Sequence, residues 1–441
     1  MDLTLDDATS RWFRGVFALA LRGGLGKLLS VASLVVLSRL LTPADFGAFA
    51  VVLLPTELTM LLADAGISAA LIRQAGPLTV QDEQAGFALR LLLAVVAGCI
   101  VAACAGLLGR LYRMEPSAVW ALRALALSQC IDPLGLIPSV RLNRALHFDR
   151  LAWAEAGSLI AGQGAAMVAA FAGWGLWSLT AGAIMTTAAG TLLVNVLAGW
   201  QPGLRFSRAS ARSLLGFGVL YQSQGVLHLA MGRIVPALGG LALSGGQVGY
   251  LVWAQDLAHW PRVPADYAAR VSFPAYAHFQ NDPAALNRLI AQALKLVSWT
   301  TLPAAALGIA LAPALISPIF GPEWLPAVGP LRMFLVQAPF DALATVLLPV
   351  IYASANARRG LQLSLIWMIL AWVSSATALV LSRSLVALPA AIAATTVVMS
   401  LLILFSLPPG VRVRGWRIMG TALGLSAVVG MLARLVWRGM P

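Results

Sequence analysis

Long apolar runs recur along the whole chain, and each is followed by a short stretch rich in arginine, proline or glycine. A segment of about 20 apolar residues is long enough to cross the hydrocarbon core of a bilayer as a helix. The chain is 60% hydrophobic and only 11% charged, whereas about 25% of the residues in a soluble domain are charged. Because the runs leave no stretch for a sizeable soluble domain, the sequence predicts an all-α integral membrane protein.

The apolar runs form two sets of six, separated by a basic polar segment at 201–213. They predict twelve transmembrane helices in two lobes, residues 1–200 and 214–407, joined by a cytoplasmic linker. A further apolar run at 418–436, within the C-terminal segment 408–441, would make thirteen spans and is left open. The expected spans are 16–41, 47–72, 86–109, 118–139, 151–173, 176–199, 214–239, 248–274, 289–318, 328–354, 361–382 and 386–406.

Basic residues on alternate loops predict the orientation, because cytoplasmic loops carry an excess of Lys and Arg. The richer set of loops holds Arg11, Arg14, Arg73, Arg141, Arg144, Arg150, Arg205, Arg208, Arg212, Arg288, Arg358, Arg359, Arg412, Arg414 and Arg417. The poorer set holds Arg110, Arg113 and Arg383, with Arg39 near a helix end. The N-terminus is therefore expected in the cytoplasm. This placement explains the net charge of +13 without nucleic acid as a partner.

The sequence predicts neither a metal site nor a cofactor. Its three cysteines, Cys99, Cys104 and Cys130, all lie in apolar segments and are interpreted as small core residues. No spacing of Cys and His resembles a metal site. The first residues are acidic, whereas a cleavable signal peptide begins with a basic region, so the first apolar segment is expected to be retained.

The motifs SRLLTPADFG at 38–47 and LADAGISAALI at 62–72 are followed by several shorter ones along the chain. In order and spacing, these motifs resemble those of the oligosaccharide flippases (Wzx/WzxC type) of the multidrug/oligosaccharidyl-lipid/polysaccharide (MOP) exporter superfamily. SRLLTPADFG at 38–47 is similar to the "ARLLTPEDFG" of their first loop, and LADAGISAALI at 62–72 to the "LADLGLGAALI" that follows. Five other segments are similar to later loops and helix starts of that family: Pro138–Leu151, Gly173–Leu179, Leu204–Ser207, Leu215–Gly218 and Phe320–Ala327.

The resemblance covers about residues 12–405 and implies two six-helix bundles in pseudo-twofold relation that open alternately to either side, as in MATE transporters. The implied cargo is an undecaprenyl-diphosphate-linked oligosaccharide that crosses the bacterial inner membrane for O-antigen, capsule or exopolysaccharide synthesis. The implied partners are membrane lipid and polysaccharide polymerase or export machinery, and a monomer is expected. Many relatives carry an Asp-Arg pair in the seventh helix, but here Gly232 precedes Arg233, so that carboxylate is missing.

Cations inside the spans are the first group of candidate site residues. A charge near the bilayer centre costs about 2.5–3.5 kcal/mol on insertion scales, so it is tolerated mainly where it faces protein or water. Arg binds phosphate through two hydrogen bonds and Lys as a point charge. A cavity for a diphosphate-linked glycan is therefore predicted to contain Arg22, Lys27, Arg233 and Arg262, with Trp253 and Trp260 stacked on sugars. For the tryptophans, packing in the helix bundle is the alternative.

Acidic residues and one histidine inside the spans form the second group, for proton or ion coupling or for ion pairs within the membrane. Its members are Glu57, Asp64, Asp132, Asp256, His259, Asp266 and Asp341. Glu57 and Asp64 are seven residues apart and lie on one helix face; neutralisation of Glu57 by Lys27 is the structural alternative. Asp132, beside Pro133, is expected to pair with a cation of the first span or to bind a proton. Arg262 and Asp266, four residues apart, are expected to pair along a helix.

Two other classes of function remain as alternatives. A cation-coupled small-molecule exporter of the MATE branch is expected to have a compact carboxylate site and a less basic cavity. A peptidoglycan-precursor flippase fits the motifs less well. A polytopic glycan-processing enzyme is disfavoured, because the loops are short and contain no nucleophile–base constellation.

Overall fold

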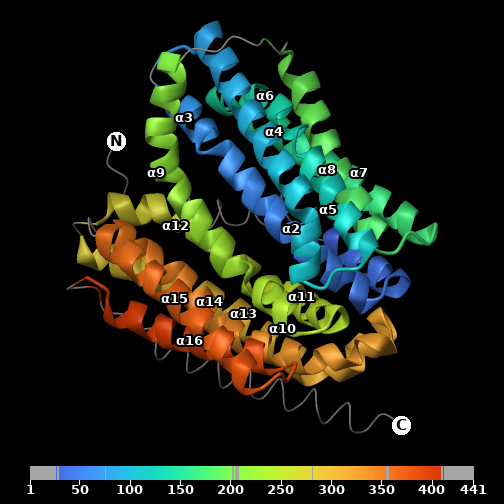
Figure 1. The fold of residues 1–441 in the computed structure, drawn as a ribbon. Helices are drawn as coiled ribbons and strands as arrows, with labels where there is room; N and C mark the ends of the chain where they lie inside the picture. Colours follow the sequence, from blue (N-terminus) through green and yellow to red (C-terminus); the bar gives the residue numbers. More distant parts are fainter. Residues whose placement is uncertain are drawn as a thin grey trace. The chain divides into compact units, whose positions relative to one another are not determined.

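The computed structural model describes residues 29–74, 76–200, 208–280, 282–353 and 357–408, together with Gly26, Gly203 and Val411. In these residues all regular structure is helical (Figure 1), which confirms the predicted all-α class. The first expected span is described only from Leu29 onward apart from Gly26, and the run at 418–436 lies outside the described residues.

Residues Leu28–Gly249 form one compact unit. It begins with the helix Leu29–Leu40. It continues with α2 (Pro43–Asp64), α3 (Ile67–Arg73), α4 (Val80–Leu111), α5 (Pro116–Ser128), the 3₁₀ turn η1 (Asp132–Gly135), α6 (Leu136–Arg144), α7 (Phe148–Phe171), α8 (Leu176–Ala198), α9 (Arg208–Gly232), the π-helical segment η2 (Val235–Gly239) and α10 (Gly240–Ala242).

The second compact unit comprises Met1–Lys27 and Tyr250–Pro441. Helix α11 (Gly245–His259) contains the boundary between the two units. The remaining elements are the 3₁₀ turn η3 (Trp260–Arg262), α12 (Val263–His278), α13 (Pro283–Phe320), the 3₁₀ turn η4 (Pro322–Ala327), α14 (Val328–Ala353), α15 (Ala357–Leu381) and α16 (Ala387–Phe405). The lobe boundaries drawn from the sequence stay a prediction.

Within the described residues, seven helices are long and apolar enough to cross a bilayer. The segments Gly225–Gly232 and Val235–Ala242 meet at a bend of 50° and together make an eighth candidate. Two other expected spans, 118–139 and 248–274, are helices broken by the 3₁₀ turns η1 and η3. A proline in each turn removes a backbone donor and breaks the regular helix. The count of twelve spans stays a prediction.

Two of the long helices start with the same type of cap. The hydroxyl of Thr42 accepts a hydrogen bond from the Asp45 backbone N–H (3.3 Å), and the Asp45 carboxylate accepts one from the Thr42 N–H (2.9 Å). Thr79 and Asp82 form the same reciprocal capping box at the start of α4. Such a box satisfies helix N–H groups that lack an intrahelical partner. The motif TPAD in the first loop is therefore the start signal of α2, with Pro43 in its first turn.

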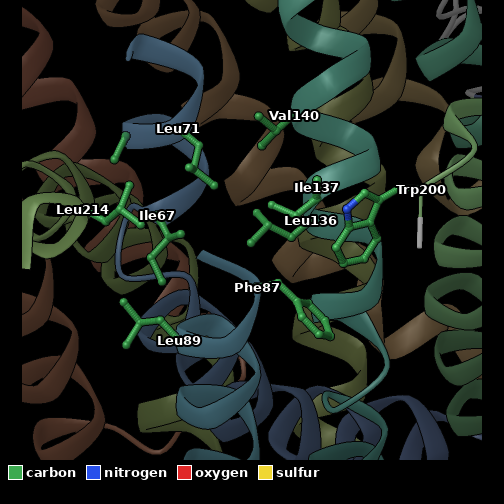
Figure 2. Packing of buried hydrophobic residues seen from close by; sticks show 10 residues of the cluster. Ile67, Leu71, Phe87, Leu89, Leu136, Ile137, Val140, Trp200 and Leu214 are labelled. Atoms are coloured by element: carbon green, nitrogen blue, oxygen red, sulfur yellow. The ribbon is translucent and has the colours of Figure 1, made fainter. Parts of the chain in front are cut away.

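The short helix α3 is held in its unit by a buried apolar cluster (Figure 2). Ile67 and Leu71 of α3 belong to this cluster with Phe87 of α4 and Ile137 of α6. The ring of Trp200 meets that of Phe87 edge to face, with centroids 5.2 Å apart. Burying such side chains contributes about 1.5–3 kcal/mol each, so the cluster fixes α3 against α4 and α6.

Helices α7 and α8 lie side by side (Figure 1), and glycine permits their close approach. A Cβ added at Gly162 of α7 would lie 1.8 Å from the Thr186 hydroxyl and 2.9 Å from the Gly182 carbonyl oxygen of α8. A Cβ at Gly164, two residues further along α7, would meet nothing within 4 Å. Small residues allow membrane helices to pack closely, and only the first of these glycines is used for that purpose.

We predict that Gly162→Val lowers the thermal unfolding midpoint of the purified protein in detergent, whereas Gly164→Val leaves it nearly unchanged. Overpacking of this kind costs about 1–3 kcal/mol. Both substitutions add the same side chain to the same helix, so they differ only in what that side chain meets. Equal midpoints for the two variants would contradict the α7–α8 contact.

Candidate substrate and ion sites within the membrane

Most of the predicted intramembrane charges that the structure describes are held in ion pairs. Three separate clusters contain them, two in the unit Leu28–Gly249 and one in the unit that includes Tyr250–Pro441. Each cluster joins side chains from different elements. In a medium of low dielectric constant an unpaired charge is costly, and an opposite charge with hydrogen bonds offsets that cost.

The first cluster is the pair Glu57–Arg233. The guanidinium donates two hydrogen bonds to the carboxylate, from Nε to Oε2 and from Nη2 to Oε1. Glu57 lies on α2 two residues after Pro55, and Arg233 lies at the break between α9 and the π-helical segment η2. About 30% of each side chain is exposed, 28% for Glu57 and 31% for Arg233. A bidentate pair of this kind combines a fixed geometry with partial access.

This pair corrects one expectation from the sequence. Gly232 does not supply the carboxylate that many relatives carry beside the arginine, but Glu57 supplies one from α2. Lys27, the alternative partner of Glu57, and Arg22 lie outside the described residues. Only the three-dimensional structure brings Glu57 and Arg233 together, because 176 residues separate them in the sequence.

The second cluster joins two aspartates through one arginine. Arg90 of α4 contacts Asp64 at the end of α2 (Nη1–Oδ1 2.7 Å) and Asp132 at the start of η1 (Nη2–Oδ2 2.6 Å). The Ser68 hydroxyl accepts a hydrogen bond from Arg90 Nη1 (2.7 Å) and donates one to Asp64 Oδ1 (2.5 Å). The Arg90 side chain is only 10% exposed. Two carboxylates thus share one buried guanidinium.

The sequence analysis missed Arg90, although it lies inside the expected span 86–109. Among the described residues, Asp132 pairs with Arg90 of α4; Arg22 and Lys27, the cations of the first span, lie outside the described residues. A count of every charge within each expected span would have found Arg90. The partners of Arg90 depend on the fold. Helix α2 ends at Asp64 because Ala65 and Gly66 form a turn with positive φ at both residues.

The third cluster surrounds Arg262 in η3. Its Nη1 donates a hydrogen bond to Asp341 Oδ2 of α14, and its Nε lies 3.7 Å from Asp266 Oδ1 of α12. This confirms the predicted pairing of Arg262 with Asp266. His259 Nε2 lies 3.4 Å from Asp266 Oδ2. The Thr301 hydroxyl donates to the Pro261 carbonyl (2.8 Å), which steadies the turn that presents Arg262.

The aromatic candidates have different surroundings. Trp253 is fully buried, stacked on Trp324 with centroids 4.9 Å apart and in edge contact with Phe320 at 4.8 Å. It therefore packs in the core, which is the alternative that the sequence left open. Trp260 in η3 is half-buried.

Of the acidic candidates, Asp256 on α11 is exposed.

Other arginines stabilise the loops. Arg141 binds the Glu83 carboxylate through two hydrogen bonds of 2.7 Å. Arg144 donates to the backbone carbonyls of Leu71 (2.9 Å) and Gln74 (2.7 Å) at the C-terminal end of α3. A cation at this position also interacts favourably with the helix dipole. Some of the arginines of the predicted cytoplasmic loops thus have structural roles.

Comparisons with known proteins agree with the fold. The family described as "Polysaccharide biosynthesis protein" matches residues 36–329, and "Lipid II flippase MurJ" matches residues 269–440. A solved structure described as "Lipid II flippase MurJ, inward closed conformation" has a TM-score of 0.73 at 14% identity and covers 96% of this chain and 98% of its own. A comparison with curated proteins found no match.

A second solved structure is described as the "inward-facing conformation of a multidrug resistance MATE family transporter of the MOP superfamily". It has a TM-score of 0.66 at 14% identity and covers 92% of this chain and 96% of its own. At such identities the likeness concerns the fold. The chain therefore has the fold of the membrane transporters of the MOP superfamily.

Within that class the chain belongs to the polysaccharide biosynthesis protein family, whose match spans more than half of its length. This confirms the superfamily that the sequence motifs indicated. The assignment to its Wzx-type members stays a prediction.

We predict that Glu57→Gln and Arg233→Gln each lower the free energy of unfolding, and that the double variant loses less than the sum. Each single change leaves the other charge unpaired, whereas the double change removes both. Coupling energies between contacting residues are about 0.5–3 kcal/mol. Chemical unfolding of the four proteins in mixed micelles measures this coupling. Glu155→Gln, on an exposed side chain of α7, is the control, and additive effects of Glu57→Gln and Arg233→Gln would contradict the pair.

Proposed function

We propose that this protein moves an undecaprenyl-diphosphate-linked oligosaccharide repeat unit across the bacterial inner membrane by alternating access, with its N-terminus in the cytoplasm. The observation that carries the proposal is the match of residues 36–329 to the polysaccharide biosynthesis protein family. The similarity of residues 269–440 to a flippase of another lipid-linked precursor supports it. The predicted excess of arginine on one side supports the orientation.

The chemistry of this cargo requires cations inside the membrane. A diphosphate carries negative charge that has to leave the headgroup region, and arginine stabilises phosphate through charge and paired hydrogen bonds. Arg233 in one unit and Arg262 in the other are the described candidates, with 31% and 23% of their side chains exposed. Arg22 and Lys27 stay predicted members of this group.

The carboxylate partners give each arginine a neutral state without cargo. Glu57 holds Arg233, and Asp341 and Asp266 hold Arg262. We propose that a diphosphate competes with these carboxylates for the same N–H donors. The exchange replaces one anion by another, so neither guanidinium is left unpaired inside the membrane, where that would be costly. Because the protein does not have to stabilise a bare cation before cargo arrives, binding and release both remain feasible.

We predict that deletion of the gene in its native host causes undecaprenyl-linked repeat units to accumulate on the cytoplasmic face of the inner membrane. The units are still made but are no longer moved. Extraction of labelled lipid-linked saccharides, with sidedness read by an impermeant glycan-modifying probe, measures the accumulation. Complementation with the wild-type gene is the control. Unchanged amounts and unchanged sidedness would contradict the proposed cargo.

We predict that Arg233→Gln and Arg262→Gln each reduce polymer export by about tenfold or more at matched protein levels. Tenfold corresponds to about 1.4 kcal/mol, within the range for one hydrogen bond to a charged group. Arg383→Gln, at an exposed loop position, is the control for loss of positive charge.

The double variant Glu57→Gln/Arg233→Gln separates binding from folding. It removes the ion pair without leaving an unpaired charge, so a purely structural role of Arg233 predicts recovery of export relative to Arg233→Gln. A role in binding the diphosphate predicts that export stays low. Recovery to the wild-type level would contradict the role of Arg233 in binding.

A further inference from the structure

The turn between α4 and α5 carries arginines that differ from those of the three clusters. Arg110 and Arg113 at the turn are exposed, and Arg123 lies within α5. Arg90, Arg233 and Arg262 each bind a carboxylate. Among the described residues, Arg110, Arg113 and Arg123 form no ion pair with a carboxylate. Glu115 supplies the single negative charge of this turn. It follows Arg110 and Arg113 in the sequence and precedes Arg123.

The register of the hairpin places these groups on neighbouring stretches of two antiparallel helices. A Cβ at Gly109 would lie 2.6 Å from the Val119 side chain, and Arg123 Nε donates to the Ala102 carbonyl at 3.4 Å. Arg123 is seven residues beyond the first residue of α5, Pro116, so its backbone is about 10 Å along the helix from the turn. This depth lies inside the apolar part of the hairpin.

The Arg123 side chain is directed back toward the turn. Its Cζ lies 4.6 Å from the ring centroid of Trp120, which is almost one helical turn nearer to Pro116. Trp120 is 60% exposed on the outside of the helix. Exposed tryptophan in membrane helices is typical of the headgroup level, and a guanidinium below that level extends toward the interface. The cation–π contact with Trp120 shows that the Arg123 side chain extends toward the turn.

We propose that the α4–α5 turn binds the phosphate of an anionic membrane phospholipid, with Arg123 and the turn arginines Arg110 and Arg113 as donors and Trp120 beside the acyl–headgroup boundary. Among the described residues, Arg123 donates to one backbone carbonyl and lies over one aromatic ring, so its Nη groups are available to an anion. At the headgroup level, toward which the Arg123 side chain extends, the anions of a bilayer are lipid phosphates. The proposal concerns a lipid that stays in the membrane, and it stands independently of the transported cargo.

The test uses the purified full-length protein with two lipid probes, phosphatidylglycerol and phosphatidylcholine, and counts lipid adducts by native mass spectrometry. The wild-type protein is expected to retain phosphatidylglycerol in preference to phosphatidylcholine. Arg123→Gln is expected to weaken phosphatidylglycerol retention about tenfold, and Arg110→Gln/Arg113→Gln also to weaken it. Arg383→Gln removes an exposed loop arginine elsewhere and is expected to change nothing. Equal retention by the wild type and Arg123→Gln would overturn the proposal.

Two further measurements separate charge from structure and lipid from free anion. Arg123→Lys keeps the positive charge but loses the Nε bond to Ala102, so retention close to that of the wild type supports a charge-dependent lipid site. Retention as weak as in Arg123→Gln would assign the effect to the Ala102 bond and overturn the site. Inorganic phosphate is expected to give no thermal stabilisation; stabilisation lost in Arg123→Gln would mean a free-phosphate site instead.

Discussion

Neutralisation of charge inside a low-dielectric bundle is the constraint on which this structure depends. Arg90, Arg233 and Arg262 each come from an interior helix segment, and each meets carboxylates from other elements. Breaking such a pair by removing one partner costs about 3–5 kcal/mol when it is buried, and less where a third of the side chain is exposed. Apolar packing alone would hold these helices together without fixing their register. The ion pairs therefore fix the positions of the helices along one another.

Several of the charged groups lie where the helices are interrupted. Asp132 opens the 3₁₀ turn η1, Arg262 closes the 3₁₀ turn η3, and Arg233 precedes the π-helical segment η2. Glu57 follows a proline inside α2. An interrupted helix frees backbone groups and changes the direction of side chains, and irregular backbone in a membrane protein is tolerated only where protein or water covers it. The same interruptions that make some spans hard to recognise thus present the candidate site residues.

The sequence predicted the helical membrane fold because twenty-residue apolar runs have few alternatives in water or lipid. It also predicted the Arg262–Asp266 pair, because a separation of four residues brings two side chains together on one helix. It did not predict Glu57 with Arg233, or Arg90 with Asp64 and Asp132, because those contacts depend on how separate helices pack. Trp253 was ambiguous for the same reason: an aromatic side chain stacks on a glycan or packs on Trp324, and only the fold distinguishes them.

Translocation by the purified protein tests the central claim most directly. The full-length chain is reconstituted into vesicles with an undecaprenyl-diphosphate-linked oligosaccharide on one leaflet, and an impermeant glycosidase reports the saccharide on the other. We predict that the wild-type protein transfers the saccharide faster than protein-free vesicles do, and that the Arg233→Gln variant transfers it more slowly than the wild type. A wild-type rate equal to that of protein-free vesicles, with the protein folded and inserted, would contradict the account.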